Sequence, residues 1–157
     1  MTGEIGKIEG VKIDPLKLHH DDRGFLTEVQ RADAPDFTEF GQFTFTLAHP
    51  GVIKAFHWHQ HQVDTWFFVT GSAQVVLFDR RPGSPTAGTT QVICAGEHNR
   101  VRITIPVGVA HGYRVLGNKP ATLCYLTSRP YNASDPDEQR IPYDDPSINF
   151  NWITAPR

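Results

Sequence analysis

The stretch HWHQHQVD, residues 57–64, places a histidine at every second position and ends on an aspartate. On a β-strand, His57, His59 and His61 would project from one face, because successive side chains alternate between faces. Neighbouring imidazoles would then lie about 6.5–7 Å apart, close enough to converge on a cavity that the strand lines. Such imidazoles can ligate a metal, transfer protons or face solvent, and the stretch alone is compatible with all three.

The spacing around these histidines adds a second pattern. Gly51 is followed after five residues by His57-Trp-His59, and four further residues lead to Asp64; residues 106–111 later read PVGVAH. This arrangement resembles the two motifs of the cupin superfamily, whose metal-binding members hold a divalent cation with such residues. The resemblance implies a possible metal site, and a mixed nitrogen and oxygen donor set suits iron, manganese, nickel, copper or zinc. Its four ligands would be His57, His59, Asp64 and His111.

We expect short β-strands to position these residues. Apolar and polar residues alternate in QFTFTLA (42–48), RVRITI (100–105) and TLCYLT (122–127), which is typical of antiparallel strands with two distinct faces. Glycine and proline separate the runs, and the runs at 65–71 and 73–79 predict a hairpin around Gly71-Ser72. We therefore predict an all-β, cupin-type jelly-roll sandwich or barrel. One domain would span residues 1–157, with 131–157 as an ordered but loop-rich tail.

Composition limits the partners. The net charge of −2 gives no electrostatic case for binding nucleic acid or an anionic membrane surface. No apolar run approaches the roughly 18 residues that a membrane span needs, and the first ten residues lack the pattern of a secretory signal. We expect a cytoplasmic protein.

Six blocks in order carry a narrower resemblance. They are DDRGFLTEV (21–29), PGVIKAFHW (50–58), VTGSAQVVLFDRRPGSPTAG (69–88), IPVGVAHGYRVL (105–116), CYLTSRPYN (124–132) and YDDPSINFNW (143–152). These blocks are similar to those of the dTDP-4-dehydrorhamnose 3,5-epimerase family. The resemblance implies a jelly-roll subunit, a homodimer that exchanges N-terminal strands, and a nucleotide-linked sugar with a ketone at C4 as the substrate.

The same resemblance implies roles for individual residues. His57 matches the base that removes a proton next to the C4 carbonyl, and Tyr125 matches the acid that returns one to the opposite face. His59 is a further catalytic candidate, because the related dTDP-sugar 3,4-ketoisomerases use both histidines of an H-x-H motif for proton transfer. The implied substrate-binding residues are Arg23, Glu28, Gln42, Lys54, His111 and Tyr131, with Arg23 donated across a dimer.

Two departures mark the chain as an atypical, C-terminally short member. Relatives carry a lysine seven residues before the glycine equivalent to Gly71, and Asp64 stands there instead. A negative charge at that place would oppose a developing enolate unless it is neutralised. Relatives also take the carboxylate that orients the base from a segment beyond the 143–152 block, and this chain has only five residues there.

The sequence therefore predicts an isomerase that epimerises or isomerises a dTDP-4-keto-6-deoxy sugar, with no cofactor favoured. Two alternatives stay open at this point. One is a metal-dependent cupin enzyme, a dioxygenase or lyase, that uses His57, His59, Asp64 and His111. The other is a cupin that binds a sugar nucleotide without catalysis.

Overall fold

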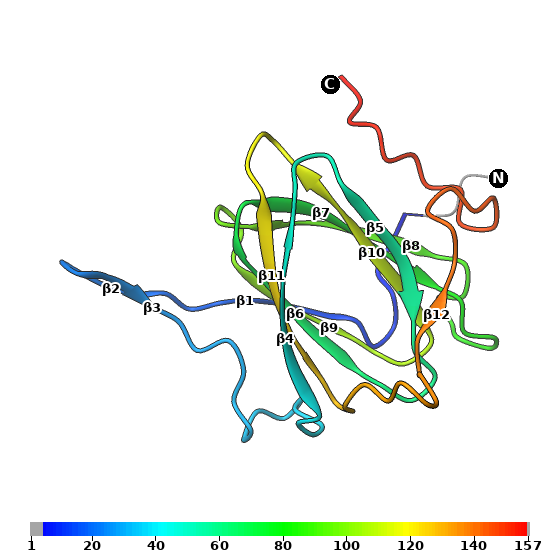
Figure 1. The fold of residues 1–157 in the computed structure, drawn as a ribbon, viewed down its shortest axis with the longest axis horizontal. Helices are drawn as coiled ribbons and strands as arrows, with labels where there is room; N and C mark the ends of the chain where they lie inside the picture. Colours follow the sequence, from blue (N-terminus) through cyan, green and yellow to red (C-terminus); the bar gives the residue numbers. More distant parts are fainter. Residues whose placement is uncertain (1–4, 157) are drawn as a thin grey trace.

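The computed structural model describes residues 5–156, and all regular elements there are β-strands. One antiparallel sheet of five strands has the order β1-β9-β6-β11-β4 (Figure 1). Its strands are β1 (Lys12–Pro15), β4 (Gln42–Ala48), β6 (Asp64–Thr70), β9 (Val101–Ile105) and β11 (Ala121–Thr127).

A second antiparallel sheet faces the first and has the order β12-β5-β10-β7-β8. Its strands are β5 (Ile53–Trp58), β7 (Ser72–Asp79), β8 (Thr90–Gly96), β10 (Val109–Leu116) and β12 (Gln139–Arg140). The inward side chains of both sheets form the main core, with Phe68, Leu77, Ile103, Val109 and Leu123 among its buried members. Two packed sheets without a helix among the described residues confirm the all-β jelly-roll class.

The polar side of β4 faces inward, because its burial alternates residue by residue. Gln42, Thr44 and Thr46 are partly buried, whereas Phe43, Phe45 and Leu47 are exposed on the outer face. A strand whose inner face is polar and whose outer face is apolar inverts the usual pattern of a soluble sheet. This inversion places a polar cavity inside the sandwich and an uncovered apolar face outside it.

The predicted hairpin at Gly71-Ser72 is wrong. Strand β6 pairs with β9 and β11, whereas β7 pairs with β8 and β10, so the chain crosses from one sheet to the other at this turn. Gly71 has a φ of 71°, and a Cβ there would lie 2.4 Å from the carbonyl oxygen of Pro120. The glycine signals a tight corner, but a turn signal does not say which strands become neighbours.

The tail after Tyr131 covers the outer face of the second sheet. Ile148 and Trp152 are buried there in a cluster with Phe56, Val76 and Ala110 from β5, β7 and β10. Short strand β12 pairs with β5 on the way, and its register sets Gln139 opposite Trp58 and Arg140 opposite His57. As far as residue 156, the tail is thus part of the packed structure although it holds only one short strand.

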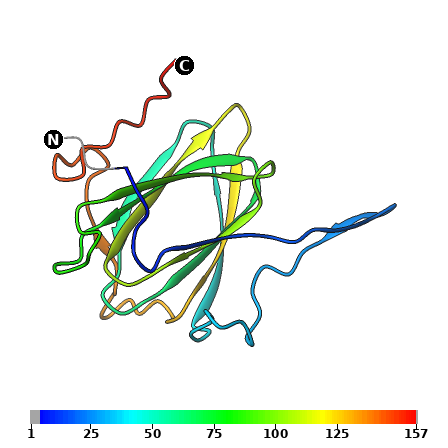
Figure 2. The same cartoon turned by 180° about the vertical axis from the view of Figure 1, so that it is seen from behind.

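A separate two-stranded ribbon, β2 (His19–Asp21) with β3 (Gly24–Leu26), projects away from the sandwich (Figures 1 and 2). All six of its residues are exposed, including Phe25 and Leu26. We call this ribbon the N-terminal arm. Within residues 5–156, no helix has the length and apolar character that crossing a membrane requires.

Candidate active site

A cavity of about 920 Å³ lies between the two sheets. Strands β4, β5, β6, β10 and β11 form its walls, and residues 131–138, which we call the strap, run along its edge. The lining side chains from these strands are Gln42, Thr46, Lys54, His57, Asp64, Trp66, His111, Tyr113, Leu123, Tyr125 and Thr127. This volume, lined by polar side chains together with aromatic and apolar ones, is large enough for a small molecule.

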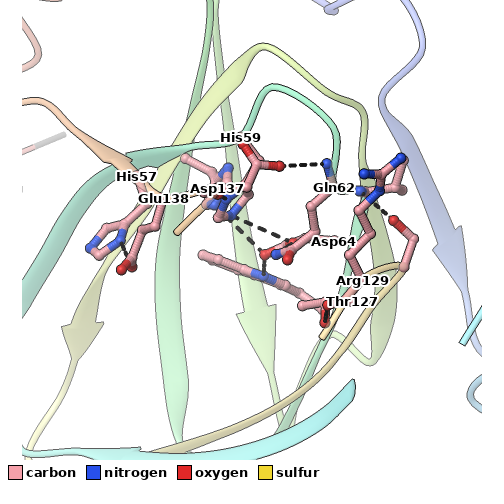
Figure 3. Close-up of polar contacts among 12 residues, drawn as sticks. His57, His59, Gln62, Asp64, Thr127, Arg129, Asp137 and Glu138 are labelled. Atoms are coloured by element: carbon pink, nitrogen blue, oxygen red, sulfur yellow. Dashed lines mark hydrogen bonds and ion pairs between the residues drawn. The ribbon is translucent and has the colours of Figure 1, made fainter. Parts of the chain in front are cut away.

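His57 is paired with a carboxylate. Its Nδ1 lies 2.6 Å from Oε1 of Glu138 (Figure 3). Glu138 directly precedes β12, so the pairing of β12 with β5 brings the acid beside the histidine. Burial raises the pKa of Glu138, but the hydrogen bond and charge of His57 outweigh it, and the pKa lies below its usual value. An ionised Glu138 accepts the hydrogen of Nδ1 and leaves the Nε2 lone pair as the base.

Sequence reasoning missed Glu138. Relatives take the orienting acid from a segment beyond the 143–152 block, which is short in this chain, whereas the structure supplies an acid that precedes that block. No local pattern in the sequence marks Glu138, because a two-residue strand such as β12 leaves no periodic signal.

His59, Asp64 and His111 form a second, buried group. Oδ1 of Asp64 lies 3.6 Å from Nε2 of His59, and Oδ2 lies 3.7 Å from Nε2 of His111. The Asp64 carboxylate also accepts hydrogen bonds from Nε2 of Gln62 at 2.7 Å and Nε1 of Trp66 at 3.1 Å. Burial raises the pKa of Asp64, but these neighbours outweigh it and the pKa is lowered. The carboxylate is therefore ionised, with two hydrogen-bond donors and the Nε2 atoms of both imidazoles around it.

Backbone carbonyls fix both imidazoles of this group. Nδ1 of His59 donates to the carbonyl of Asp137, and Nδ1 of His111 donates to the carbonyl of Val109 at 3.0 Å. Both Nε2 atoms consequently face Asp64. Burial lowers the pKa of His111 to about 4, so this ring is neutral at neutral pH. Burial also lowers the pKa of His59, but Asp64 and Asp137 outweigh it and the net shift is upward.

Two adjacent residues of the strap, Asp137 and Glu138, bind the histidine stretch at residues 57–62. The carboxylate of Asp137 accepts the backbone N–H groups of Gln60, His61 and Gln62 at 2.7, 2.9 and 3.0 Å. Its carbonyl orients His59 while Glu138 next to it orients His57 (Figure 3). Strand β5 ends at Trp58 and the chain then bends, so the predicted single strand face through His61 is wrong.

Of the four residues that the cupin pattern proposed for a metal, three converge. The ligand atoms of His59, Asp64 and His111 lie within 4.8 Å of one another, and all three residues are buried. His57 is not a member of this group and pairs with Glu138 instead. The histidines of the H-x-H motif therefore have two different partners.

Most of the other predicted site residues line the same cavity. Tyr125 does so from β11, and burial raises its pKa. Lys54 reaches Oγ1 of Thr46 at 3.1 Å, and Gln42 accepts the backbone N–H of Tyr131 at 2.9 Å. Besides Glu138, sequence reasoning missed Asp137, Arg129 and Tyr113 as lining residues.

Arg23 and Glu28 do not line this cavity. Arg23 lies on the exposed N-terminal arm and bonds Asp21, and Glu28 follows the arm and pairs with Arg31 at 2.9 Å. Within one chain, these two predicted substrate-binding residues are apart from the site.

A family model described as dTDP-4-dehydrorhamnose 3,5-epimerase matches residues 6–157. The chain belongs to this family. It is 54% identical to the spore coat polysaccharide biosynthesis protein SpsL of Bacillus subtilis over 147 residues, which cover 94% of this chain and 97% of that one.

Two solved structures are similar in fold to this chain. A dTDP sugar isomerase from Desulfovibrio desulfuricans has a TM-score of 0.87 and 29% identity, with 95% of this chain and 94% of that one covered. A dTDP-6-deoxy-D-glucose-3,5-epimerase from Legionella pneumophila, in complex with dTDP-4-keto-L-rhamnose, has a TM-score of 0.82 and 29% identity, covering 95% and 81%. The chain therefore matches relatives over nearly its whole described length.

Proposed function

We propose that the protein epimerises or isomerises a dTDP-linked 4-keto-6-deoxy sugar by removing a proton next to the C4 ketone. The observation that carries this proposal is the His57–Glu138 pair at the wall of a cavity that Tyr125 also lines. The Legionella relative, whose structure holds dTDP-4-keto-L-rhamnose, supports the choice of substrate class.

The chemistry follows from the placement of the two groups. Nε2 of His57 takes the acidic proton from the carbon beside the ketone, and an enolate forms. Glu138 stabilises the resulting imidazolium across its 2.6 Å contact. His57 lies on β5 of one sheet and Tyr125 on β11 of the other, so the two groups approach the sugar from opposite walls. Return of a proton from Tyr125 to the opposite face inverts the carbon.

The neighbours of Asp64 in the structure make its negative charge compatible with the formation of an enolate. This charge is met by two hydrogen-bond donors, Gln62 and Trp66, and by His59, whose pKa Asp64 raises. A carboxylate that accepts these hydrogen bonds does not act on an enolate as a bare negative charge. The loss of the relatives' lysine therefore does not exclude proton abstraction, and His59 stays a catalytic candidate.

The test is exchange with solvent. Incubation with a dTDP-4-keto-6-deoxy sugar in heavy water should place deuterium at C3 or C5, as read by NMR. The exchange should disappear in His57→Ala and persist in His98→Ala, whose histidine is exposed and outside the cavity. Absence of exchange on every 4-keto sugar tried, with binding retained, would favour the non-catalytic binder instead.

A metal-dependent cupin enzyme is the second candidate. It is supported by the ligand atoms of His59, Asp64 and His111, which lie within 4.8 Å of one another, while backbone carbonyls orient both imidazoles. Two histidines and a carboxylate fit iron, manganese or zinc. Protein purified without chelator should then contain stoichiometric metal, lost in Asp64→Asn. A metal content far below stoichiometry would reject this candidate.

We further propose a cytoplasmic homodimer in which the N-terminal arm of one subunit supplies Arg23 to the cavity of the other. Arg23 is exposed and outside its own chain's cavity, and Phe43, Phe45 and Leu47 leave an apolar outer face on β4. A guanidinium suits pyrophosphate, and Lys54 and Arg129 already line the cavity. Light scattering should give twice the chain mass of 17.6 kDa, and a monomer would contradict the proposal.

A further inference from the structure

Tyr113 is a cavity residue to which the chemistry above gives no role. It lies on β10, two residues after His111, and is only 3% exposed. Its ring packs edge-on against Trp66 and Phe68, with ring centroids 5.8 and 5.2 Å away. These aromatic contacts hold the ring in place and would be available to a phenylalanine as well.

The Tyr113 hydroxyl has no hydrogen-bond partner among residues 5–156, although less than 1 Å² of its oxygen is exposed. A buried hydroxyl without a partner costs folding free energy, so phenylalanine would serve the fold better at this position. Unbonded polar groups of this kind are rare in folded proteins and call for a partner that the chain itself does not supply.

The surroundings indicate what that partner is. Tyr113 lines the same cavity as Tyr125, the proposed acid, and both rings lie against Trp66, with centroids 5.8 and 6.5 Å from it. Burial raises the pKa of Tyr113 to about 12, so the group is a neutral hydrogen-bond donor rather than a second proton-transfer acid. A neutral donor at a cavity wall suits an oxygen of an uncharged group, such as a sugar hydroxyl or ketone.

We propose that the Tyr113 hydroxyl is a substrate-binding group, which donates a hydrogen bond to an oxygen of the bound sugar, directly or through one water. This inference rests on the proposed function, because it assumes a sugar nucleotide in the cavity. It deepens that function by assigning a residue that contacts the sugar and not the nucleotide.

The experiment compares Tyr113→Phe with the wild-type protein by calorimetry, using dTDP-glucose and dTDP as probes. Loss of one hydrogen bond should weaken dTDP-glucose binding roughly 2–10-fold and leave dTDP binding unchanged. The unliganded variant should melt at the same or a higher temperature, because the substitution removes an unbonded buried hydroxyl. Tyr143→Phe, at a half-exposed position outside the cavity, should change neither quantity.

Several results would overturn the inference. Unchanged dTDP-glucose affinity would show that the hydroxyl does not meet the sugar, and a lower melting temperature with that result would place its partner within the protein. Equally weaker binding of dTDP-glucose and dTDP would mean that the hydroxyl affects binding of the nucleotide and not of the sugar. Binding is read without turnover, so a wild-type protein that binds both probes but exchanges no deuterium rejects the proposed chemistry alone. A wild-type protein that binds neither probe rejects both.

Discussion

His57 and Glu138 are the pair whose loss the proposed chemistry can least tolerate. Glu138→Gln keeps the size of the side chain but removes the charge that stabilises the imidazolium form of His57. We expect kcat to fall roughly 10²–10⁴-fold with little change in KM, because Glu138 acts through His57. Steady-state kinetics on a dTDP-4-keto-6-deoxy sugar measure both constants.

Arg140→Gln is the matched control for this residue. Arg140 contacts the other carboxylate oxygen of Glu138 at 3.5 Å, and its side chain is 74% exposed. Exposed ion pairs contribute little, so this variant should retain near wild-type kcat. A Glu138→Gln variant whose kcat stays within about threefold of wild type, or whose defect lies in KM alone, would refute the positioning role.

At the scale of elements, period-two alternation predicted the strands that are regular and missed the arrangements that depend on distant partners. Strands β4, β9 and β11 follow the alternating runs closely. The crossing at Gly71 and the bend after Trp58 were not predictable, because both depend on which strands pair. The position of Glu138 was not predictable for the same reason, because β12 acquires its register only by pairing with β5. His57 and Tyr125 line the cavity because alternation along their strands turns them inward, whereas Lys54 was predicted from the family resemblance alone.

The tail shows that an element without regular structure can still hold the site in place. Trp152 is buried against Phe56 and Phe150, and its indole N–H donates to the carbonyl of Tyr143 at 2.9 Å. Trp152→Ala should reduce the free energy of unfolding by about 3–5 kcal/mol, because it leaves a cavity over β5. Urea unfolding followed by circular dichroism measures this change.

The neighbouring residue gives a control for that prediction. Ile153 is 76% exposed, so Ile153→Ala should change the unfolding free energy by less than about 0.5 kcal/mol. If both variants had equally small effects, the tail would not be packed on the sheet as described.

At the scale of the whole molecule, resistance to acid should depend on a buried carboxylate that does not line the cavity. Asp79 is fully buried at the end of β7 and accepts hydrogen bonds from Arg81, Ser84 and Thr86. Burial raises its pKa, but these donors outweigh it and hold the pKa well below the usual 3.8. A carboxyl group whose pKa is lowered by folding stabilises the fold above its unfolded pKa, and this stabilisation is lost as the pH falls.

Asp79→Asn should therefore lose about 3 kcal/mol of unfolding free energy at pH 7, because Arg81 loses its anionic partner and an NH2 donor replaces one of the two acceptor oxygens. The difference from wild type should shrink as the pH falls below the usual carboxyl range, since Asp79 of the unfolded wild-type chain then takes up a proton while the folded carboxylate stays ionised. Asp33→Asn, at an exposed position paired with Arg31, should show no measurable difference at either pH. Denaturant titrations at pH 7 and in acid test this, and a gap that is constant with pH would mean that the charge of Asp79 does not stabilise the fold.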